Sequence, residues 1–112
     1  MSYEPEVDAT YAKVYQDETP DILQAFSAFG ATVFAPEGRA IPLRYRELIA
    51  VGVAIASQCE PCIDHHSNAA TDAGATSNEL AEAAWVASML RAGGAFAHGR
   101  LAFKYAGAHS HA

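Results

Sequence analysis

Two cysteines are the residues of this chain whose type and spacing most directly suggest chemistry. Cys59 and Cys62 are the only cysteines, and they form a C-x-x-C pair. A cysteine reacts as its thiolate, and the pKa of a thiol falls from roughly 8.5 to about 3.5–7.5 at a helix N-terminus, beside a cation or in a C-x-x-C pair. A thiolate can attack a substrate and become a sulfenic acid or mixed disulfide, which the neighbouring thiol resolves. The pair therefore indicates redox turnover at sulfur.

A histidine and a carboxylate are spaced to supply proton transfer to these thiols. His66 follows Cys62 by four residues, so the two side chains project from the same face of a helix. Glu47 precedes Cys59 by twelve residues, on an apolar segment. If the two segments are helices that fold back on each other, a rise of about 1.5 Å per residue places Glu47 nearer to His66 than to Cys62. We expect a proton relay from Glu47 to His66, directly or through a water, and then to the cysteines.

A metal site is one alternative for the same cluster. Cys59, Cys62 and His66 are three possible ligands. A closed structural zinc site needs a fourth ligand, which Glu47 or His65 would have to supply. On a helix His65 points about 100° away from His66, so we expect it to be a solvated neighbour. We predict no metal, and no organic cofactor either, because the chain has no Gly-rich phosphate loop.

Structural roles are the other alternative for the ionisable residues. Glu47 could be a buried salt-bridge partner of one of three arginines: Arg44, Arg46 or Arg91. His98 is more simply a surface or packing residue than a catalytic one. Glu60 and Asp64 lie near the thiols in sequence and would oppose thiolate formation, so we expect both to face solvent.

Helices must position these residues, and six segments carry helical signals. The signals are apolar residues at helical spacing, residues that cap helix starts, and Gly or Pro at helix ends. The segments cover about residues 8–15, 20–34, 42–57, 61–74, 77–92 and 95–105. Residues 1–7 are expected to be loose, and Thr19 is expected to cap the second helix. Thr76 and Glu79 predict a capping box at the start of the fifth helix, and Gly93-Gly94 separates it from the sixth.

The third segment, from Pro42 to about Ser57, is apolar nearly all round in its second half, which predicts a central, buried helix. A carboxylate on such a helix needs a partner or a polar pocket. The β-branched residues of this segment could also form a strand, but no second strand exists to pair with it. We therefore predict an all-α single domain over residues 1–112, a bundle of about six helices with its core at about residues 20–106.

The composition suits one small globular domain and excludes several kinds of partner. Apolar residues make up 51% of the chain and charged residues 18%, which leaves little polar surface and favours self-association. A net charge of −6 with scattered Lys and Arg makes nucleic acid or an anionic membrane a poor partner. No apolar stretch is long enough to span a membrane, and the N-terminal residues lack the apolar core of a signal peptide. We expect a cytoplasmic protein.

The four candidate residues fill the pattern E-x11-C-x-x-C-x3-H, and on this pattern the chain resembles the carboxymuconolactone decarboxylase and alkylhydroperoxidase D superfamily. The flanking stretches RELIAVGVA, SNAATDAGAT and SNELAEAAWVASMLRAGGAFAHG agree, so the resemblance covers about residues 22–105. It implies an all-helical, alkylhydroperoxidase D-like bundle that assembles into homotrimers or homohexamers. The better-studied alkylhydroperoxidase D proteins are longer, with two related halves, and have a histidine where this chain has Pro61.

The resemblance also implies roles for the four residues. In the peroxidase branch the second cysteine, here Cys62, reduces a small hydroperoxide, and Cys59 then closes the disulfide. A dithiol such as dihydrolipoamide, or a thioredoxin-like protein, reopens it, while His66 and Glu47 match the proton relay. We therefore predict a thiol-dependent peroxidase or disulfide oxidoreductase, an alkylhydroperoxidase-like enzyme with peroxiredoxin-type activity.

Two other functions remain open. The decarboxylase branch acts on an anionic lactone and does not depend on the cysteine pair. The complete C-x-x-C-x3-H pattern and the few arginines near the predicted site argue against it here. A non-enzymatic redox-sensing oligomer, whose disulfide changes its assembly, is also compatible with the sequence.

Overall fold

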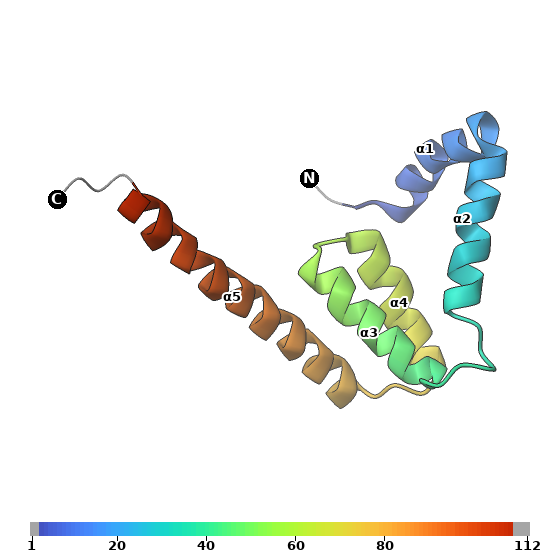
Figure 1. Ribbon diagram of the computed structural model, residues 1–112. Helices are drawn as coiled ribbons and strands as arrows, with labels where there is room; N and C mark the ends of the chain where they lie inside the picture. The colour runs from blue at the N-terminus through green and yellow to red at the C-terminus, as the bar shows by residue number, and fades with distance from the viewer. Residues whose placement is uncertain (1–2, 109–112) are drawn as a thin grey trace.

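The computed structural model describes residues 3–108, which form helices joined by short connections and contain no strand (Figure 1). Five helices follow in order: α1 (Pro5–Glu18), α2 (Pro20–Val33), α3 (Leu43–Ala56), α4 (Glu60–Asp72) and α5 (Ser77–Ala108). The prediction of an all-α fold is confirmed, with one helix fewer than expected.

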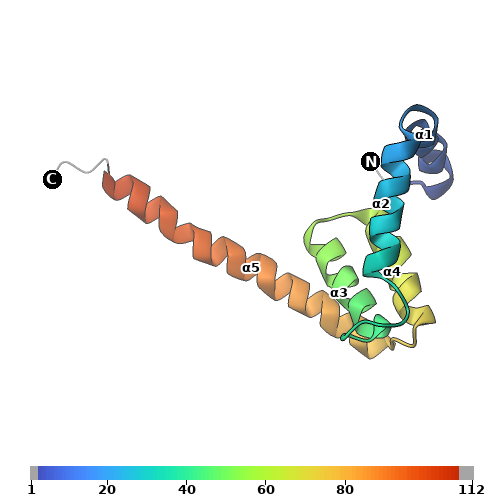
Figure 2. The ribbon, with the colours of Figure 1, turned by 45° about the vertical axis from the view of Figure 1, so that its right-hand side comes forward.

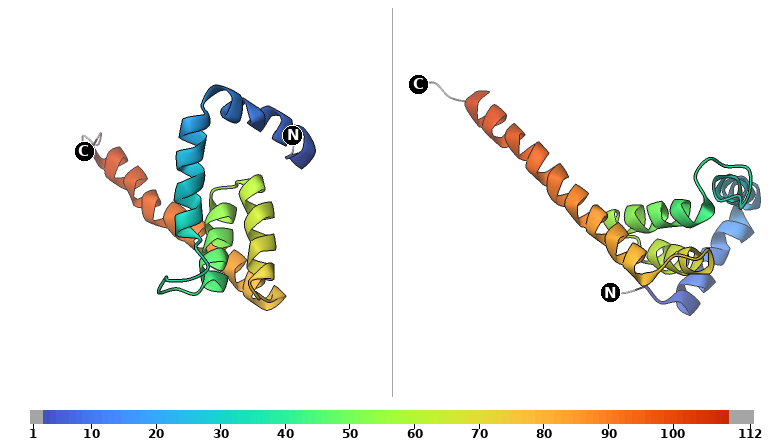
Figure 3. Two further views of the ribbon diagram at one scale, coloured as in Figure 1. Left: turned by 90° about the vertical axis from the view of Figure 1, so that its right-hand side faces the viewer. Right: turned by 90° about the horizontal axis from the view of Figure 1, so that it is seen from below.

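Helix α3 is the centre of the packing. Helices α4 and α5 both lie against α3, whereas α1 packs mainly on α2. Figures 1 and 2 show α3 and α4 as an antiparallel pair, with the α1–α2 arm on one side of it. The two views in Figure 3 show the second half of α5 extending away from the other helices. The radius of gyration is 19.1 Å, against about 13 Å for a compact chain of this length, so the chain is elongated.

The core is small and is built mostly from short side chains. Its buried apolar residues are Val51, Ala54, Ala70, Ala75 and Ala87. Such small residues let the helices approach closely, and a Cβ added at Gly52 of α3 would lie 3.6 Å from a carbonyl oxygen of α5. Helix α3, which carries Glu47, is therefore packed closely against the first half of α5.

Helix α3 is central but it is not buried all round, contrary to the expectation from its composition. Val51 and Ala54 are buried, whereas Ile49 and Val53 are 53% and 61% exposed. These two residues line an apolar groove of about 580 Å³ between α3 and α5. The apolar pattern predicted a helix covered on every side, and within one protomer the side that faces this groove has no cover.

Helix α5 continues through Gly93-Gly94, so the predicted helix end there and the separate sixth helix are wrong. Neither glycine has the positive φ that typically follows a helix end, whereas Gly38 and Gly74 do, at 80° and 100°. Each glycine costs a helix about 1 kcal/mol relative to alanine. The residues around Gly93-Gly94 include no proline and no Ser, Thr, Asp or Asn that could cap the start of a new helix, so the helix continues.

The first helix begins earlier than expected. Helix α1 starts at Pro5 instead of Asp8, because proline suits the first helical turn, where its missing N–H is not needed. Acidic side chains in this turn also favour the start, since they lie near the positive end of the helix dipole. The expectation that residues 1–7 are loose is therefore wrong from Pro5 onward, and residues 1 and 2 lie outside the described part of the chain.

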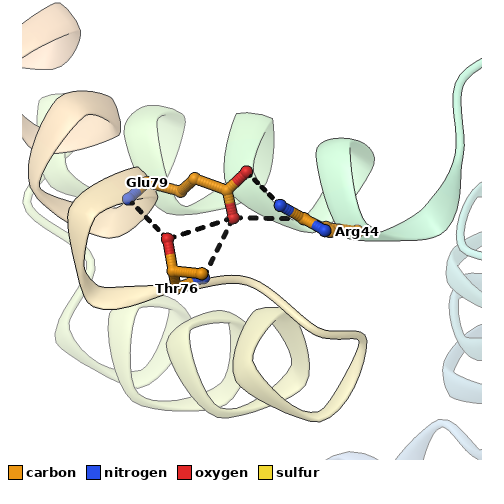
Figure 4. Close-up of polar contacts among 3 residues, drawn as sticks. All are labelled: Arg44, Thr76 and Glu79. Carbon is orange, nitrogen blue, oxygen red and sulfur yellow. Dashed lines mark hydrogen bonds and ion pairs between the residues drawn. The ribbon is translucent and has the colours of Figure 1, made fainter.

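The two threonines expected to cap helices behave differently. Thr19 precedes α2, but its hydroxyl donates to the carbonyl of Tyr15 at 3.0 Å and does not cap α2. At the start of α5, the hydroxyl of Thr76 accepts from the N–H of Glu79 at 3.1 Å. The Glu79 carboxylate in turn accepts from the N–H of Thr76 at 2.9 Å, which confirms the capping box (Figure 4).

Glu79 also ties α5 to α3. Its Oε1 accepts from Nε of Arg44 at 3.1 Å, and its Oε2 accepts from Nη2 of the same guanidinium (Figure 4). The hydrogen bond to Arg44, followed by that from the Thr76 N–H, lowers the pKa of Glu79, and the pair raises the pKa of Arg44. One carboxylate thus caps α5 and holds its first turn against the start of α3.

Candidate active site

The turn between α3 and α4 places the first cysteine. Helix α3 ends in a Schellman motif: the N–H of Gln58 donates to Ile55 at 3.1 Å, and the N–H of Cys59 donates to Ala54 at 3.0 Å. Gln58 has the left-handed conformation that this motif requires, with φ at 56°. The turn reverses the chain, so that Cys59 completes the end of α3 and is also the N-cap residue of α4.

Cys59 and Cys62 form a disulfide across the first turn of α4, with their Cα atoms 5.2 Å apart. Both residues are half-buried. The free N–H groups of a first turn and the helix dipole favour negative charge at this position, and negative charge is what a reacting thiol carries. Glu60 and Asp64 are exposed, as expected. The N-terminus of α4 therefore favours a thiolate once the disulfide is reduced.

Glu47 and His66 are hydrogen-bonded between α3 and α4. Oε1 of Glu47 lies 2.6 Å from Nδ1 of His66. Glu47 is 5% exposed, and it is the only buried charged residue among residues 3–108. The side chain of His66 retains 19% exposure. A buried carboxylate needs a hydrogen-bonding partner, and the histidine provides it by direct contact, at the place that the helical rise predicts.

The three arginines considered as partners of Glu47 bind elsewhere. Arg44 pairs with Glu79, and Arg91 donates to a main-chain carbonyl at the end of α3. Arg46 donates to three main-chain carbonyls between residue 33 and residue 41. The interpretation of Glu47 as a salt-bridge partner of an arginine is therefore wrong.

Two aromatic rings contact His66 in ways that the sequence does not indicate. Phe34 follows α2, and its ring centroid lies 4.9 Å from that of the imidazole, with 32° between the planes. The ring of His65 is exposed, as expected, yet it meets the His66 ring edge-on at 4.7 Å. The helical pattern of residues 20–34 gives no sign of this contact of Phe34, because the contact depends on the path of the connection between α2 and α3.

The arrangement places a disulfide and an imidazole on one helix. Within residues 3–108, no three His, Cys, Asp or Glu side chains converge in the way that a metal site requires.

His98 is exposed on the second half of α5. No helix in this part of the chain is both long enough and apolar enough to cross a bilayer. The candidate chemistry therefore rests on Cys59, Cys62, His66 and Glu47.

Comparison with known proteins identifies the family. A model of the carboxymuconolactone decarboxylase family matches residues 20–105, which is most of the chain. The chain belongs to the carboxymuconolactone decarboxylase family. This membership confirms the resemblance inferred from the E-x11-C-x-x-C-x3-H pattern, and all four candidate residues lie within the matched range.

Two solved structures share this fold. The crystal structure of a protein from Methanobacterium thermoautotrophicum is 34% identical and superposes with a TM-score of 0.72, covering 82% of this chain and 98% of that one. The apo structure of a carboxymuconolactone decarboxylase family protein from Legionella pneumophila is 29% identical, with a TM-score of 0.65 over 76% of this chain and 73% of that one.

Two curated relatives are uncharacterised proteins. One is uncharacterised protein 4 in the cox locus of Paracoccus denitrificans, 47% identical over 74 residues, which are 66% of this chain and 65% of that protein. The other, from Haemophilus influenzae, is 45% identical over 51 residues, or 46% of this chain and 43% of that protein. The chain thus spans less than two thirds of the length of each.

Proposed function

We propose that this member of the carboxymuconolactone decarboxylase family is a thiol-dependent peroxidase or disulfide oxidoreductase. The hydrogen bond between Glu47 and His66 carries the proposal, because it joins a buried acid–base pair to the helix that bears the two cysteines. A small hydroperoxide is the substrate class, and a dithiol or a thioredoxin-like protein is the reductant.

The first step breaks the O–O bond of the hydroperoxide. In the reduced protein Cys62, after losing its proton to His66, attacks the terminal oxygen of ROOH as a thiolate, so that an S–O bond forms and the O–O bond breaks. Cys62 is oxidised by two electrons to a sulfenic acid, and the departing alkoxide takes a proton from His66 and leaves as an alcohol. The choice of Cys62 as the attacking thiol follows the resemblance to the peroxidase branch.

The second step closes the disulfide. Cys59, after losing its proton to His66, attacks the sulfur of the Cys62 sulfenic acid, so that the S–S bond forms and the S–O bond breaks. The hydroxide takes the proton and leaves as water. A dithiol then reduces the protein disulfide by exchange and is itself oxidised to a disulfide, which restores both thiols.

Glu47 gives His66 its orientation for these proton transfers. With Nδ1 bonded to the Glu47 carboxylate, the imidazole is left to exchange protons through Nε2, which has no hydrogen-bond partner among the described residues. A carboxylate at Nδ1 also stabilises the imidazolium that forms when the histidine takes a proton. Glu47 thus orients the imidazole through Nδ1, while Nε2 is available to take and return a proton in each of the two thiol steps.

The deciding experiment is consumption of an organic hydroperoxide with dihydrolipoamide as reductant, comparing the wild-type protein with Cys62→Ser. We expect turnover in the wild type and its loss in the variant. No turnover by the wild type with this or another dithiol would remove the proposal. Lactone turnover by the Cys59→Ala, Cys62→Ala double variant would instead favour a decarboxylase, and a disulfide that changes only the assembly would favour a redox sensor.

We also propose that the protein works as a homo-oligomer, with the trimer or hexamer implied by the family resemblance. Large apolar side chains are exposed on α5: Trp85 at 74%, Phe96 at 88% and Phe103 at 79%. An elongated protomer that leaves such residues in water gains by covering them with a second copy. The low proportion of charged residues supports the same conclusion.

A further inference from the structure

We propose that Arg46 and Phe34 are positioning residues that hold the imidazole of His66 in its working orientation. This inference rests on the proposed function, because it assigns both residues to the same proton relay. Neither residue contains a group that titrates in the reaction, and each is argued to act through the histidine.

Arg46 binds three carbonyl oxygens at once. Nη1 donates to the carbonyl of Val33 at 2.7 Å, and Nη2 donates to that of Ala35 at 2.7 Å. Nε donates to the carbonyl of Ile41 at 2.8 Å. The last carbonyls of a helix have no partner within it and carry its negative dipole end, so a cation is favoured at the end of α2. All three guanidinium nitrogens are used, which a single ammonium group cannot reproduce.

The hydrogen bonds of Arg46 are made on both sides of one residue, Phe34. Arg46 holds the carbonyls of Val33 and Ala35, which are the residues on either side of Phe34. The main chain at Phe34 is thereby fixed to α3. The half-buried phenyl ring then lies against the His66 imidazole, with the centroids 4.9 Å apart and the planes 32° from each other.

Two consecutive residues of α3 thus hold one histidine of α4. Glu47 binds Nδ1 directly, and Arg46 acts on the ring through Phe34. A single hydrogen bond restricts rotation of the imidazole about χ1 and χ2 but does not fix it alone. The tilted contact with the phenyl ring of Phe34 adds a second restraint on the ring and therefore on the direction of Nε2. Small misplacements of a reacting group are costly in rate.

Two variants and one control test this inference in the full-length protein. Arg46→Lys keeps the positive charge at the end of α2 but has a single nitrogen in place of the three spread nitrogens of the guanidinium. Phe34→Leu keeps an apolar side chain but removes the aromatic ring. Arg39→Lys is the control, because Arg39 donates to the carbonyl of Thr32 at 3.2 Å, near the same helix end but outside the pair that flanks Phe34. Circular dichroism checks that each variant is folded, and if Arg46→Lys does not fold, Phe34→Leu alone decides.

The first readout is the NMR signal of the His66 ring in the reduced protein, assigned with His66→Gln. We expect Arg46→Lys, which keeps the phenyl ring, to shift the ring signals away from those of the wild type, and the control to leave them in place. Loss of the phenyl ring current shifts the signals of Phe34→Leu by itself, so for that variant the alkylation rate described next decides. The second readout is the rate of alkylation of Cys62 in a Cys59→Ser background, which we expect to fall several-fold in both variants. Both readouts are independent of peroxide turnover, so loss of the proposed function in the wild type would not affect them.

The third readout is turnover. We expect kcat to fall about tenfold in both variants while the KM for the hydroperoxide stays unchanged, since the histidine is misplaced and the substrate is still bound. Unchanged His66 signals in folded Arg46→Lys would overturn the inference, as would an unchanged alkylation rate in Phe34→Leu or equal losses in the Arg39→Lys control. A rise in KM alone would also overturn it, because that result would make Phe34 a wall of the substrate site.

Discussion

Gln58 and Gly74 occupy the same position at the ends of two successive helices. Each is the left-handed residue that follows the helix, with φ at 56° and 100°. In both motifs its N–H and that of the next residue bond back to the helix, at 3.1 and 3.0 Å for α3 and at 3.0 and 2.9 Å for α4. The left-handed conformation costs a residue with a Cβ about 1–2 kcal/mol, and glycine avoids this cost.

Substitutions of these two residues should therefore change the free energy of unfolding in opposite directions. We expect Gly74→Ala to lower the free energy of unfolding by about 1–2 kcal/mol and Gln58→Gly to raise it by about 1 kcal/mol. A Cβ at Gly74 would lie 3.9 Å from the Arg44 side chain, so crowding adds nothing to the strain. Urea unfolding measures both values. The helical Gly30→Ala is the control, and a loss of stability there as large as at Gly74 would contradict the explanation.

Removing the charge of Glu47 should slow turnover without removing the cysteine chemistry. We expect Glu47→Gln to lower kcat about a hundredfold, since an amide can accept the hydrogen bond but does not stabilise an imidazolium, and general acid–base catalysis has at least this magnitude. Steady-state hydroperoxide consumption measures the effect. Glu60→Gln, exposed on the same helix as the cysteines, should change kcat little. Equal losses in the two variants would place the effect in the local charge and not in the relay.

The order of the two thiols can be read from trapped intermediates. After one equivalent of hydroperoxide, we expect Cys59→Ser to accumulate a sulfenic acid on Cys62, because no thiol remains to resolve it. Cys62→Ser should accumulate none. Labelling with a sulfenic-acid-specific dione followed by mass spectrometry distinguishes the two. A label on Cys59 in the second variant would reverse the assigned roles.

The Arg44–Glu79 pair should make stability depend on pH at the acid end. The pKa of Glu79 is lowered in the folded state by the Arg44 hydrogen bond, so its contribution is fully present above about pH 4.3, the ordinary glutamate value. This contribution is lost as the pH falls through the lower pKa of the folded state. We expect the stability difference between the wild type and Glu79→Gln to be largest near neutral pH and to vanish on acidification.

Urea unfolding at a series of pH values measures that difference. Glu82 is exposed on the same helix and has no ion pair within the described residues. The stability difference between the wild type and Glu82→Gln should therefore not change with pH. A difference for Glu79→Gln that grows on acidification would show that the pair does not stabilise the fold.

The exposed apolar side chains of α5 predict that the protein self-associates in solution. We expect light scattering to give a multiple of the 11.8 kDa protomer, and Phe96→Glu to lower it, because a charge cannot be buried in an apolar interface without a partner. Lys104→Glu, on the same half of α5, changes charge without removing an apolar contact and should keep the wild-type mass. A monomeric wild type would refute self-association.

The extent of sequence-based prediction differs between the site and the scaffold. Glu47, His66 and the cysteines lie on neighbouring helices with a short turn between them, so the helical rise alone limits where they can be. Phe34 was not foreseen because its contact with His66 depends on a nine-residue connection, residues 34–42, whose path no periodic pattern describes. The prediction of a helix end at Gly93-Gly94 was wrong for the opposite reason. The two glycines weaken a helix locally, but the neighbouring sequence favours no other structure, so the helix continues.

The main-chain hydrogen bonds around Cys59 do not involve sulfur, so they do not depend on whether the disulfide is closed. The N–H of Cys59 is bound to α3, and its carbonyl accepts from the N–H of Ile63 at 2.9 Å, so the main chain of Cys59 is held in place independently of the disulfide. In the proposed reaction, the thiol of Cys59 would then lie next to a sulfenic acid on Cys62 without any rearrangement of the main chain. Rapid closure of the disulfide would leave a second hydroperoxide little time to attack, so we expect the turn to limit overoxidation of Cys62 to the sulfinic acid.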